Sequence, residues 1–319
     1  MKKRNNKVIV LIVVAVLFAV SLLIFILNYS KDNSSFSILE KKWINDNTSN
    51  VLDISVYNDV PVYGKSGKGV IFDLLDDFTT TYGINFNKIS YSVDSSSNLN
   101  KNAFRVLNNN ESLTNKDILL YEDNYVLVST EEEVINNIND IDNHTVAVLK
   151  KDLNTVSNDL SEVKKISYLQ KENVNELEEA LKNKETNYVI VPYNMYMDFI
   201  LKNDLYILYH FSDISKKYVL TIENKTFLDI MKKYYLGYQK NKQQTSYKTN
   251  LLSEFFYDKE ITEADRMSYN SSSYNVGYIT YMPFTGKEEK DLVGTLSNYL
   301  SSFEDLFDVD LKVKYYNNI

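Results

Sequence analysis

The stretch VLDISVYNDVPVYGKSGKGVIFDLLDDFTTTYGINFNKISY, residues 51–91, decides the fold. It opens with apolar residues that alternate from Leu52 to Val56, which is typical of a strand with one buried face. Apolar residues then recur at helical spacing from Val70 to Phe78, and a second extended segment starts at Ile84. The order strand, loop, helix, strand predicts a parallel βαβ unit of an α/β sheet.

The same pattern returns in residues 275–316, which read NVGYITYMPFTGKEEKDLVGTLSNYLSSFEDLFDVDLKVKYY. Gly69 aligns with Gly294 and Tyr91 with Tyr316 without a gap, and Pro61 pairs with Pro283 across a loop that is longer in the second copy. A single long repeat indicates two tandem globular domains rather than a solenoid. The second copy, residues 274–319, stops after one βα unit.

Several of these features occur together in one known family. A strand, a Pro–aromatic loop (Pro61, Tyr63) and a Gly followed by Asp-Leu (Gly69, Asp73-Leu74) resemble the opening of a family 3 extracellular solute-binding protein, with the type 2 periplasmic-binding or Venus-flytrap fold. Residues 140–148 and 179–190 resemble later segments of that family. The resemblance covers about residues 40–260 and implies a two-lobed α/β domain at 51–260, with its second lobe at about 125–204.

Composition excludes several classes of function. The net charge of −8 and the pI of about 5.0 argue against nucleic acid as a partner. The absence of cysteine removes thiol catalysis and Cys-ligated metal sites. The two histidines, His144 and His210, lie in a turn and after a strand, and we expect structural roles for both. We therefore predict no catalytic site, no metal and no cofactor, and a binding protein rather than an enzyme.

Residues 8–27 form an apolar run interrupted only by Ser21 and preceded by four basic residues. At ~1.5 Å per residue such a run spans a bilayer, and the basic residues place the N-terminus in the cytoplasm. We expect a cytoplasmic tail at 1–7, a transmembrane signal anchor at 8–27 and a membrane-proximal linker at 28–50. The bulk of a single-pass cell-membrane protein would then be extracytoplasmic. The alternative is a cleaved signal peptide, but no cleavage pattern is evident.

The rest of the chain divides by composition and periodicity. We expect Trp43 to pack on the first lobe, residues 92–110 to form an exposed insertion, and 118–121 and 125–129 to be short strands. Further strands are expected at 205–209 and 218–222, a helix at 227–238, and a linker at 261–273.

Ligands of two-lobed α/β proteins bind between the lobes, beyond the carboxyl ends of the strands. In lobe two, free N–H groups at a helix start near Asp152 would suit an anion. Tyr63 takes the place of an aromatic that in the family stacks on ligand. The predicted ligand-binding residues are Tyr57, Asp59, Tyr63, Arg105, Lys151, Asn154 and Tyr193.

Two positions depart from the family pattern. Amino-acid-binding members carry Thr-x-x-Arg, whose Arg clamps the ligand carboxylate, but here Asp117 follows Thr114. Arg105 is the only Arg between the apolar run and the linker, so it is the only substitute. Pro192 stands where the family has an acidic residue for the ligand amine. An α-amino acid ligand is therefore not implied.

Two classes of function fit these observations. The first is the input portion of a tandem-flytrap signalling receptor, such as a sensor kinase or diguanylate cyclase. The second is a tethered substrate-binding component of an ABC-type importer for a small polar solute. An accessory module of a cell-wall enzyme is a third option. The partner would be a small-molecule ligand or another protein.

Overall fold

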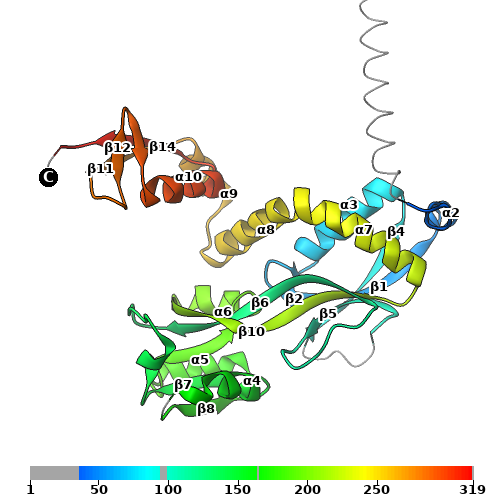
Figure 1. Cartoon of the computed structure of the whole chain (residues 1–319), viewed down its shortest axis with the longest axis horizontal. Coiled ribbons are helices and arrows are strands. Elements are labelled where there is room, and N and C mark those ends of the chain that lie inside the picture. Colours follow the sequence, from blue (N-terminus) through cyan, green and yellow to red (C-terminus); the bar gives the residue numbers. More distant parts are fainter. Residues whose placement is uncertain (1–35, 94–98, 164, 318–319) are drawn as a thin grey trace, which may run out of the picture.

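The computed structural model describes residues 36–93, 99–163 and 165–317 (Figure 1). Lobe one is built on the predicted βαβ unit, in which strand β1 (Val51–Tyr57), helix α3 (Val70–Tyr82) and strand β4 (Asn85–Tyr91) follow in order. Strands β1 and β4 pair in parallel, so the predicted unit is confirmed. Gly69 precedes the helix with φ +119°, and a Cβ there would lie 2.5 Å from the Tyr63 carbonyl oxygen, so glycine is required.

Other elements complete lobe one. Trp43 stacks on Phe227 with ring centroids 5.0 Å apart, which confirms that Trp43 packs on this lobe. The remaining elements are helix α2 (Ile38–Asn47), the hairpin strands β2 (Asp59–Val60) and β3 (Gly64–Lys65), strand β5 (Asn102–Leu107) and helix α7 (Lys225–Asn241).

Strand β5 lies within the segment that was expected to be an exposed insertion, so that expectation is wrong for its second half. Ala103 and Phe104 are buried, and β5 pairs with β1 at Ser55↔Ala103. The Ser- and Asn-rich sequence on either side masked a strand of six residues, of which Ala103, Phe104 and Leu107 are buried.

Two long strands connect the lobes. Strand β6 (Asp117–Ser129) has 13 residues and strand β10 (Tyr206–Ile222) has 17, and they pair antiparallel. The prediction of separate short strands is therefore wrong. Each strand continues because register shifts, including one between His210 and Ser215, let it bend without ending. We call β6 and β10 the hinge strands.

Lobe two extends the same sheet. Its elements are β7 (Thr145–Leu149), α4 (Leu153–Asp159), β8 (Ser167–Lys171), α5 (Val174–Lys182), β9 (Tyr188–Pro192) and α6 (Met197–Lys202), with 3-10 turns at Ile138–Ile141 and Leu160–Glu162. The sheet order is β4-β1-β5-β10-β6-β9-β7-β8. The pairs Lys217↔Leu107 and Tyr125↔Pro192 bring the carboxyl ends of β5 and β9 to the middle of the hinge strands.

Helix α8 (Gln243–Asp258) was not predicted, because none of its residues is buried and it lacks a clear apolar face. It contacts both lobes nevertheless. Ser246 Oγ donates to Asp73 in lobe one at 2.6 Å, and Tyr247 OH donates to Asn194 Oδ1 in lobe two at 3.0 Å.

A smaller unit follows at the C-terminal end (Figure 1). Its elements are α9 (Glu263–Asn270), β11 (Ser273–Tyr278), β12 (Gly286–Glu288), β13 (Asp291–Val293), α10 (Thr295–Phe307) and β14 (Asp310–Tyr315). Strands β11 and β14 pair in parallel, as β1 and β4 do. Helix α9 lies within the predicted linker at 261–273.

The start of helix α10 repeats the start of helix α3. Val70 N donates to Val62 O and Ile71 N to Tyr63 O, while Thr295 N donates to Pro283 O and Leu296 N to Phe284 O. These bonds place Pro283 opposite Val62 and Phe284 opposite Tyr63. The sequence pairing of Pro61 with Pro283 is therefore off by one residue.

Residues 36–93, 99–163 and 165–317 contain no helix that is both long enough and apolar enough to cross a membrane. The predicted anchor at 8–27, with the tail at 1–7 and the first part of the linker, lies outside the described residues. The expectation of a single-pass membrane location is corrected on this finding.

Candidate functional site

A cavity of about 370 Å³ lies where the two lobes meet the hinge strands. Lobe one supplies most of its wall, lobe two supplies Lys151 and Met195, and β10 supplies Lys216. The full lining is Tyr91, Val93, Leu99, Arg105, Val106, Asn108, Glu111, Lys151, Met195 and Lys216. We call this the interlobe cavity. Because both lobes line it, a ligand there would contact both.

Lys216 holds the two lobes together at this cavity. Its Nζ donates to Asn108 Oδ1 of lobe one at 2.8 Å and to Asp152 Oδ1 of lobe two at 2.6 Å. The Lys216 and Asp152 side chains are only 4% and 2% exposed. Tyr125 OH donates to the same Asp152 oxygen at 2.8 Å, while Asp152 Oδ2 is buried without a partner.

A second buried carboxylate, Asp123, ties β6 to the turn after β9. It accepts from Asn194 N at 2.8 Å, from Met195 N at 2.9 Å and from Tyr218 OH at 2.8 Å. Burial raises the pKa of Asp123 above the usual aspartate value, and these hydrogen bonds offset that rise only in part. Asp123 is therefore a structural link between hinge and lobe two.

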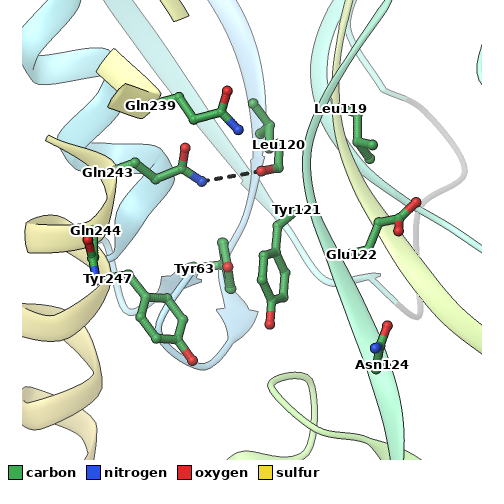
Figure 2. Close-up of a pocket in the computed structure, with 10 residues that line it drawn as sticks. All are labelled: Tyr63, Leu119, Leu120, Tyr121, Glu122, Asn124, Gln239, Gln243, Gln244 and Tyr247. Atoms are coloured by element: carbon green, nitrogen blue, oxygen red, sulfur yellow. Dashed lines mark hydrogen bonds between the residues drawn. The ribbon is translucent and has the colours of Figure 1, made fainter. Parts of the chain in front are cut away.

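A second cavity, of about 700 Å³, lies between β6 and helix α8 (Figure 2). Tyr121 projects from β6 and Tyr247 from α8, with Tyr63 between them, and Gln243 Nε2 donates to Leu120 O at 3.2 Å. Its lining residues are Tyr63, Leu119, Leu120, Tyr121, Glu122, Asn124, Gln239, Gln243, Gln244 and Tyr247. None of them belongs to lobe two beyond the hinge, so a molecule bound there would not bridge the lobes.

Three of the predicted site residues lie at or beside the interlobe cavity. Arg105 from β5 and Lys151 from lobe two both line it, although they are far apart in the sequence. Asp59 accepts hydrogen bonds from Ser92 Oγ and from Val93 N, so it orders the chain next to the cavity wall. Ligand contact by these residues remains a prediction.

Tyr57 and Tyr63 are both buried, and neither lines the interlobe cavity, although Tyr63 lines the second cavity. Tyr57 is 0% and Tyr63 is 2% exposed. Tyr63 stacks on Tyr121 and on Tyr218, each with centroids 4.9 Å apart. The turn before Gly69 points the Tyr63 ring inward, where aromatic packing stabilises the hinge. Burial raises the pKa values of both tyrosines well above the ordinary value.

Asn154 and Tyr193 are not brought to the interlobe cavity. Asn154 lines a separate surface pocket with Asn158 and Asp213. Tyr193 packs edge-on against His210, with centroids 6.3 Å apart. At the start of α4, where an anion site was expected, Asp152 occupies the cap position and pairs with Lys216.

The Thr114–Asp117 segment is structural. Asp117 accepts from Thr114 N at 2.8 Å and from Thr221 Oγ1 at 2.6 Å. Burial would raise the pKa of Asp117, but these hydrogen bonds outweigh it and hold the pKa below the usual value.

Sequence reasoning missed Lys216, Asn108 and Glu111. Lys216 could have been found from the sequence, because it alternates with the apolar residues Ile214, Tyr218 and Leu220. All four are buried in strand β10. A lysine at a position where the alternation calls for an apolar residue indicates a buried ion pair. In the part of the chain that the structure describes, no cluster of His, Cys, Asp or Glu is arranged to hold a metal ion.

The sequence matches no protein-family model and no curated protein. Among solved structures, the periplasmic domain of Bordetella pertussis BvgS is similar over 89% of this chain and 60% of its own length, with TM-score 0.51 and 12% identity. The BvgS VFT2 domain (double mutant F375E/Q461E) matches 67% of this chain and 97% of its own length, with TM-score 0.50 and 13% identity.

An arginine-bound substrate-binding protein, AbpA of an amino acid ABC transporter from Streptococcus pneumoniae, covers 68% of this chain and 98% of its own length, with TM-score 0.46 and 16% identity. This chain spans 60% of the BvgS periplasmic domain. Residues 36–260 therefore have the Venus-flytrap fold of the family 3 solute-binding proteins, the family that the sequence resembles.

Proposed function

We propose that this chain is a ligand-binding domain that takes a small molecule into the interlobe cavity. The observation that carries the proposal is the lining of that cavity, which combines Arg105 of lobe one, Lys151 of lobe two and Lys216 of the hinge. A ligand that contacts all three favours one arrangement of the lobes over another, and differential contact of that kind shifts a conformational equilibrium.

We further propose a biological role for this ligand-binding domain. The chain is the input portion of a tandem-flytrap signalling receptor, such as a sensor kinase or diguanylate cyclase. The C-terminal unit supports it, because β11, α10 and β14 repeat the order and the parallel pairing of β1, α3 and β4. We propose that residues 274–319 begin a second flytrap copy after the linker at 261–273. The similarity in fold to the BvgS periplasmic domain, over 89% of this chain, also supports it.

The second candidate is the substrate-binding component of an importer for a small polar solute. It is favoured by the completeness of the first domain, whose two lobes share one sheet and enclose their own cavity. The genomic sequence after residue 319 separates the candidates. A reading frame that continues into a kinase or cyclase domain supports the receptor, and neighbouring permease genes support the importer.

The ligand-binding function is tested by thermal unfolding of the purified full chain with amino acids, carboxylates, sugars, nucleosides and polyamines. A ligand at 100 times its dissociation constant raises the unfolding temperature by several degrees for a domain of this size. We expect one class to do so, and expect Arg105→Gln to abolish that shift. No shift with any class would contradict the function.

A further inference from the structure

Helix α8 begins on lobe one, one residue after the end of helix α7. In its first half, Ser246 Oγ and Asn250 Nδ2 both donate to Asp73 Oδ2 of helix α3, at 2.6 and 2.8 Å. Hydrogen bonds to an ionised carboxylate are stronger than bonds between neutral groups. The first half of α8 is therefore attached to lobe one.

The end of α8 is attached to lobe two. Lys259, the residue that caps this helix, donates from Nζ to the Leu201 carbonyl oxygen at 2.8 Å and to Asp204 Oδ1 at 2.6 Å. Leu201 lies in helix α6, and helices α6 and α8 are in contact. Nearer the start of α8, Tyr247 OH donates to Asn194 of lobe two as well. Helix α8 thus crosses from one lobe to the other.

One ion pair near the end of α8 returns to lobe one. Glu254 Oε2 lies 2.7 Å from Lys65 Nζ, but the same ammonium lies 2.6 Å from Asp198 Oδ2 of helix α6. Lysine carries its charge on a flexible four-carbon stem, so the Lys65 ammonium can follow its partners when the backbone of lobe one shifts. The Lys65 ammonium therefore joins α8 to α6 as much as it joins α8 to lobe one.

The C-terminal unit contacts the last turn of α8. Phe307 of helix α10 lies against Phe255 and Phe256, with ring centroids 6.1 and 6.4 Å apart. The Arg266 guanidinium of helix α9 lies 4.5 Å from the centroid of the Phe256 ring. Both phenylalanines are within about one helical turn of Lys259. Because a helix is stiff over one turn, the groups that hold Lys259 also fix the position of α10.

We infer that the last turn of helix α8 fixes the C-terminal unit, residues 263–315, to lobe two. A change in the arrangement of the lobes then moves this unit relative to lobe one, although the chain leaves the first domain from helix α7 of lobe one. Small shifts between packed elements are amplified in this way in hinge and shear motions. The inference goes beyond the proposed ligand-binding function and holds whatever moves the lobes.

Distances between pairs of spin labels test this inference in the full chain. The chain contains no cysteine, so Thr80→Cys in α3, Glu179→Cys in α5 and Ser301→Cys in α10 place labels at exposed positions in lobe one, lobe two and the C-terminal unit. Pulsed electron–electron double resonance gives the width of each distance distribution. We expect the 179–301 distribution to be about half as wide as the 80–301 distribution, because only lobe one moves freely relative to the other two.

Two variants break the attachment at different points. Lys259→Gln removes the bonds from α8 to lobe two, and Phe307→Ala removes the aromatic contact between α8 and α10. Each should widen the 179–301 distribution about twofold, since units without a substantial interface move independently. Phe307→Ala should leave the 80–179 distribution, which reports on the two lobes alone, unchanged.

Each variant has a matched control. Lys150→Gln removes a lysine that pairs with Glu172 inside lobe two, with Nζ and Oε1 2.7 Å apart. Tyr299→Ala removes a ring of α10 that is 64% exposed. Neither control should change the 179–301 distribution. Unfolding temperatures of the unlabelled proteins show whether each variant is folded.

Several outcomes would overturn the inference. One is a 179–301 distribution as wide as the 80–301 distribution in the chain that carries only the labels. Another is a 179–301 width that neither Lys259→Gln nor Phe307→Ala changes. A narrow 80–301 distribution beside a wide 179–301 distribution would show that the C-terminal unit follows lobe one instead. None of these results bears on ligand binding, which thermal unfolding with ligands tests separately.

Discussion

Lys65 of lobe one and Asp198 of lobe two form an ion pair across the domain, with Nζ and Oδ2 2.6 Å apart. The same ammonium lies 2.7 Å from Glu254 Oε2 of helix α8. Burial lowers the pKa of Lys65, but the hydrogen bonds to the two carboxylates outweigh it and raise the pKa above the ordinary value. The lobes are thus held by Lys216 at the interlobe cavity and by Lys65 next to helix α8.

Loss of the Lys65 ion pairs should loosen the lobes. We expect Lys65→Gln to broaden the distribution of interlobe distances and to lower the free energy of unfolding by about 1 kcal/mol. The chain contains no cysteine, so Thr80→Cys and Glu132→Cys would carry unique spin labels on the two lobes. Lys88→Gln is the matched control, because Lys88 pairs with Asp76 inside lobe one. Equal distance distributions for both variants would contradict the prediction.

Tyr63 should behave as a core residue. We expect Tyr63→Ala to lower the free energy of unfolding by about 3–5 kcal/mol, since it removes the ring stacked between Tyr121 and Tyr218. Tyr63→Phe keeps the ring and should cost less than about 1.5 kcal/mol. Tyr299, which is 64% exposed, supplies the control Tyr299→Ala. Denaturant unfolding measures all three, and a Tyr63→Ala protein as stable as the control would refute the core assignment.

Asp117 should make stability depend on pH in the acid range. Its pKa is lower in the folded chain than in the unfolded chain, so its ionised form contributes stability above the unfolded pKa. That contribution is lost as the pH falls through the lower, folded pKa. We expect Asp117→Asn to be destabilised by about 1–2 kcal/mol at pH 7 and the difference to shrink below pH ~4. Urea unfolding at a series of pH values tests this, and a constant difference would exclude it.

Gly69 and Gly294 should be equally intolerant of a side chain, each in its own unit. A Cβ would lie 2.5 Å from Tyr63 O at Gly69 and 2.6 Å from Phe284 O at Gly294, where φ is +100°. We expect each Ala variant to lose about 2 kcal/mol or more in its own unit. Hydrogen exchange should rise in 51–91 for Gly69→Ala and in 273–316 for Gly294→Ala.

Gly237 supplies the control for both variants. It lies in helix α7, and a Cβ added there would meet no atom of another element within 4 Å. Gly237→Ala should therefore stabilise that helix by up to about 1 kcal/mol. Faster exchange throughout the chain in either the Gly69 or the Gly294 variant would contradict the independence of the two units.

The sequence by itself determined the βαβ unit, its second occurrence and the family of folds. These follow from local signals, namely a change from period two to helical spacing and glycines that precede and end the helix. It also identified Arg105 as a candidate, by elimination, and Lys151, by its place in a loop. The sequence predicted each hinge strand as two short strands, because polar residues such as Glu122 and Asp213 interrupt the apolar pattern.

Only the tertiary structure decided what the cavity contains. The Lys216–Asp152 pair joins residues 64 positions apart, and the Arg105 and Lys151 side chains meet at one cavity because two lobes fold against the hinge. Tyr63 was expected at a ligand surface, but the direction of its ring depends on a turn held by hydrogen bonds from Val70 and Ile71. Such contacts are set by packing between distant segments, and residue type and local spacing carry no record of them.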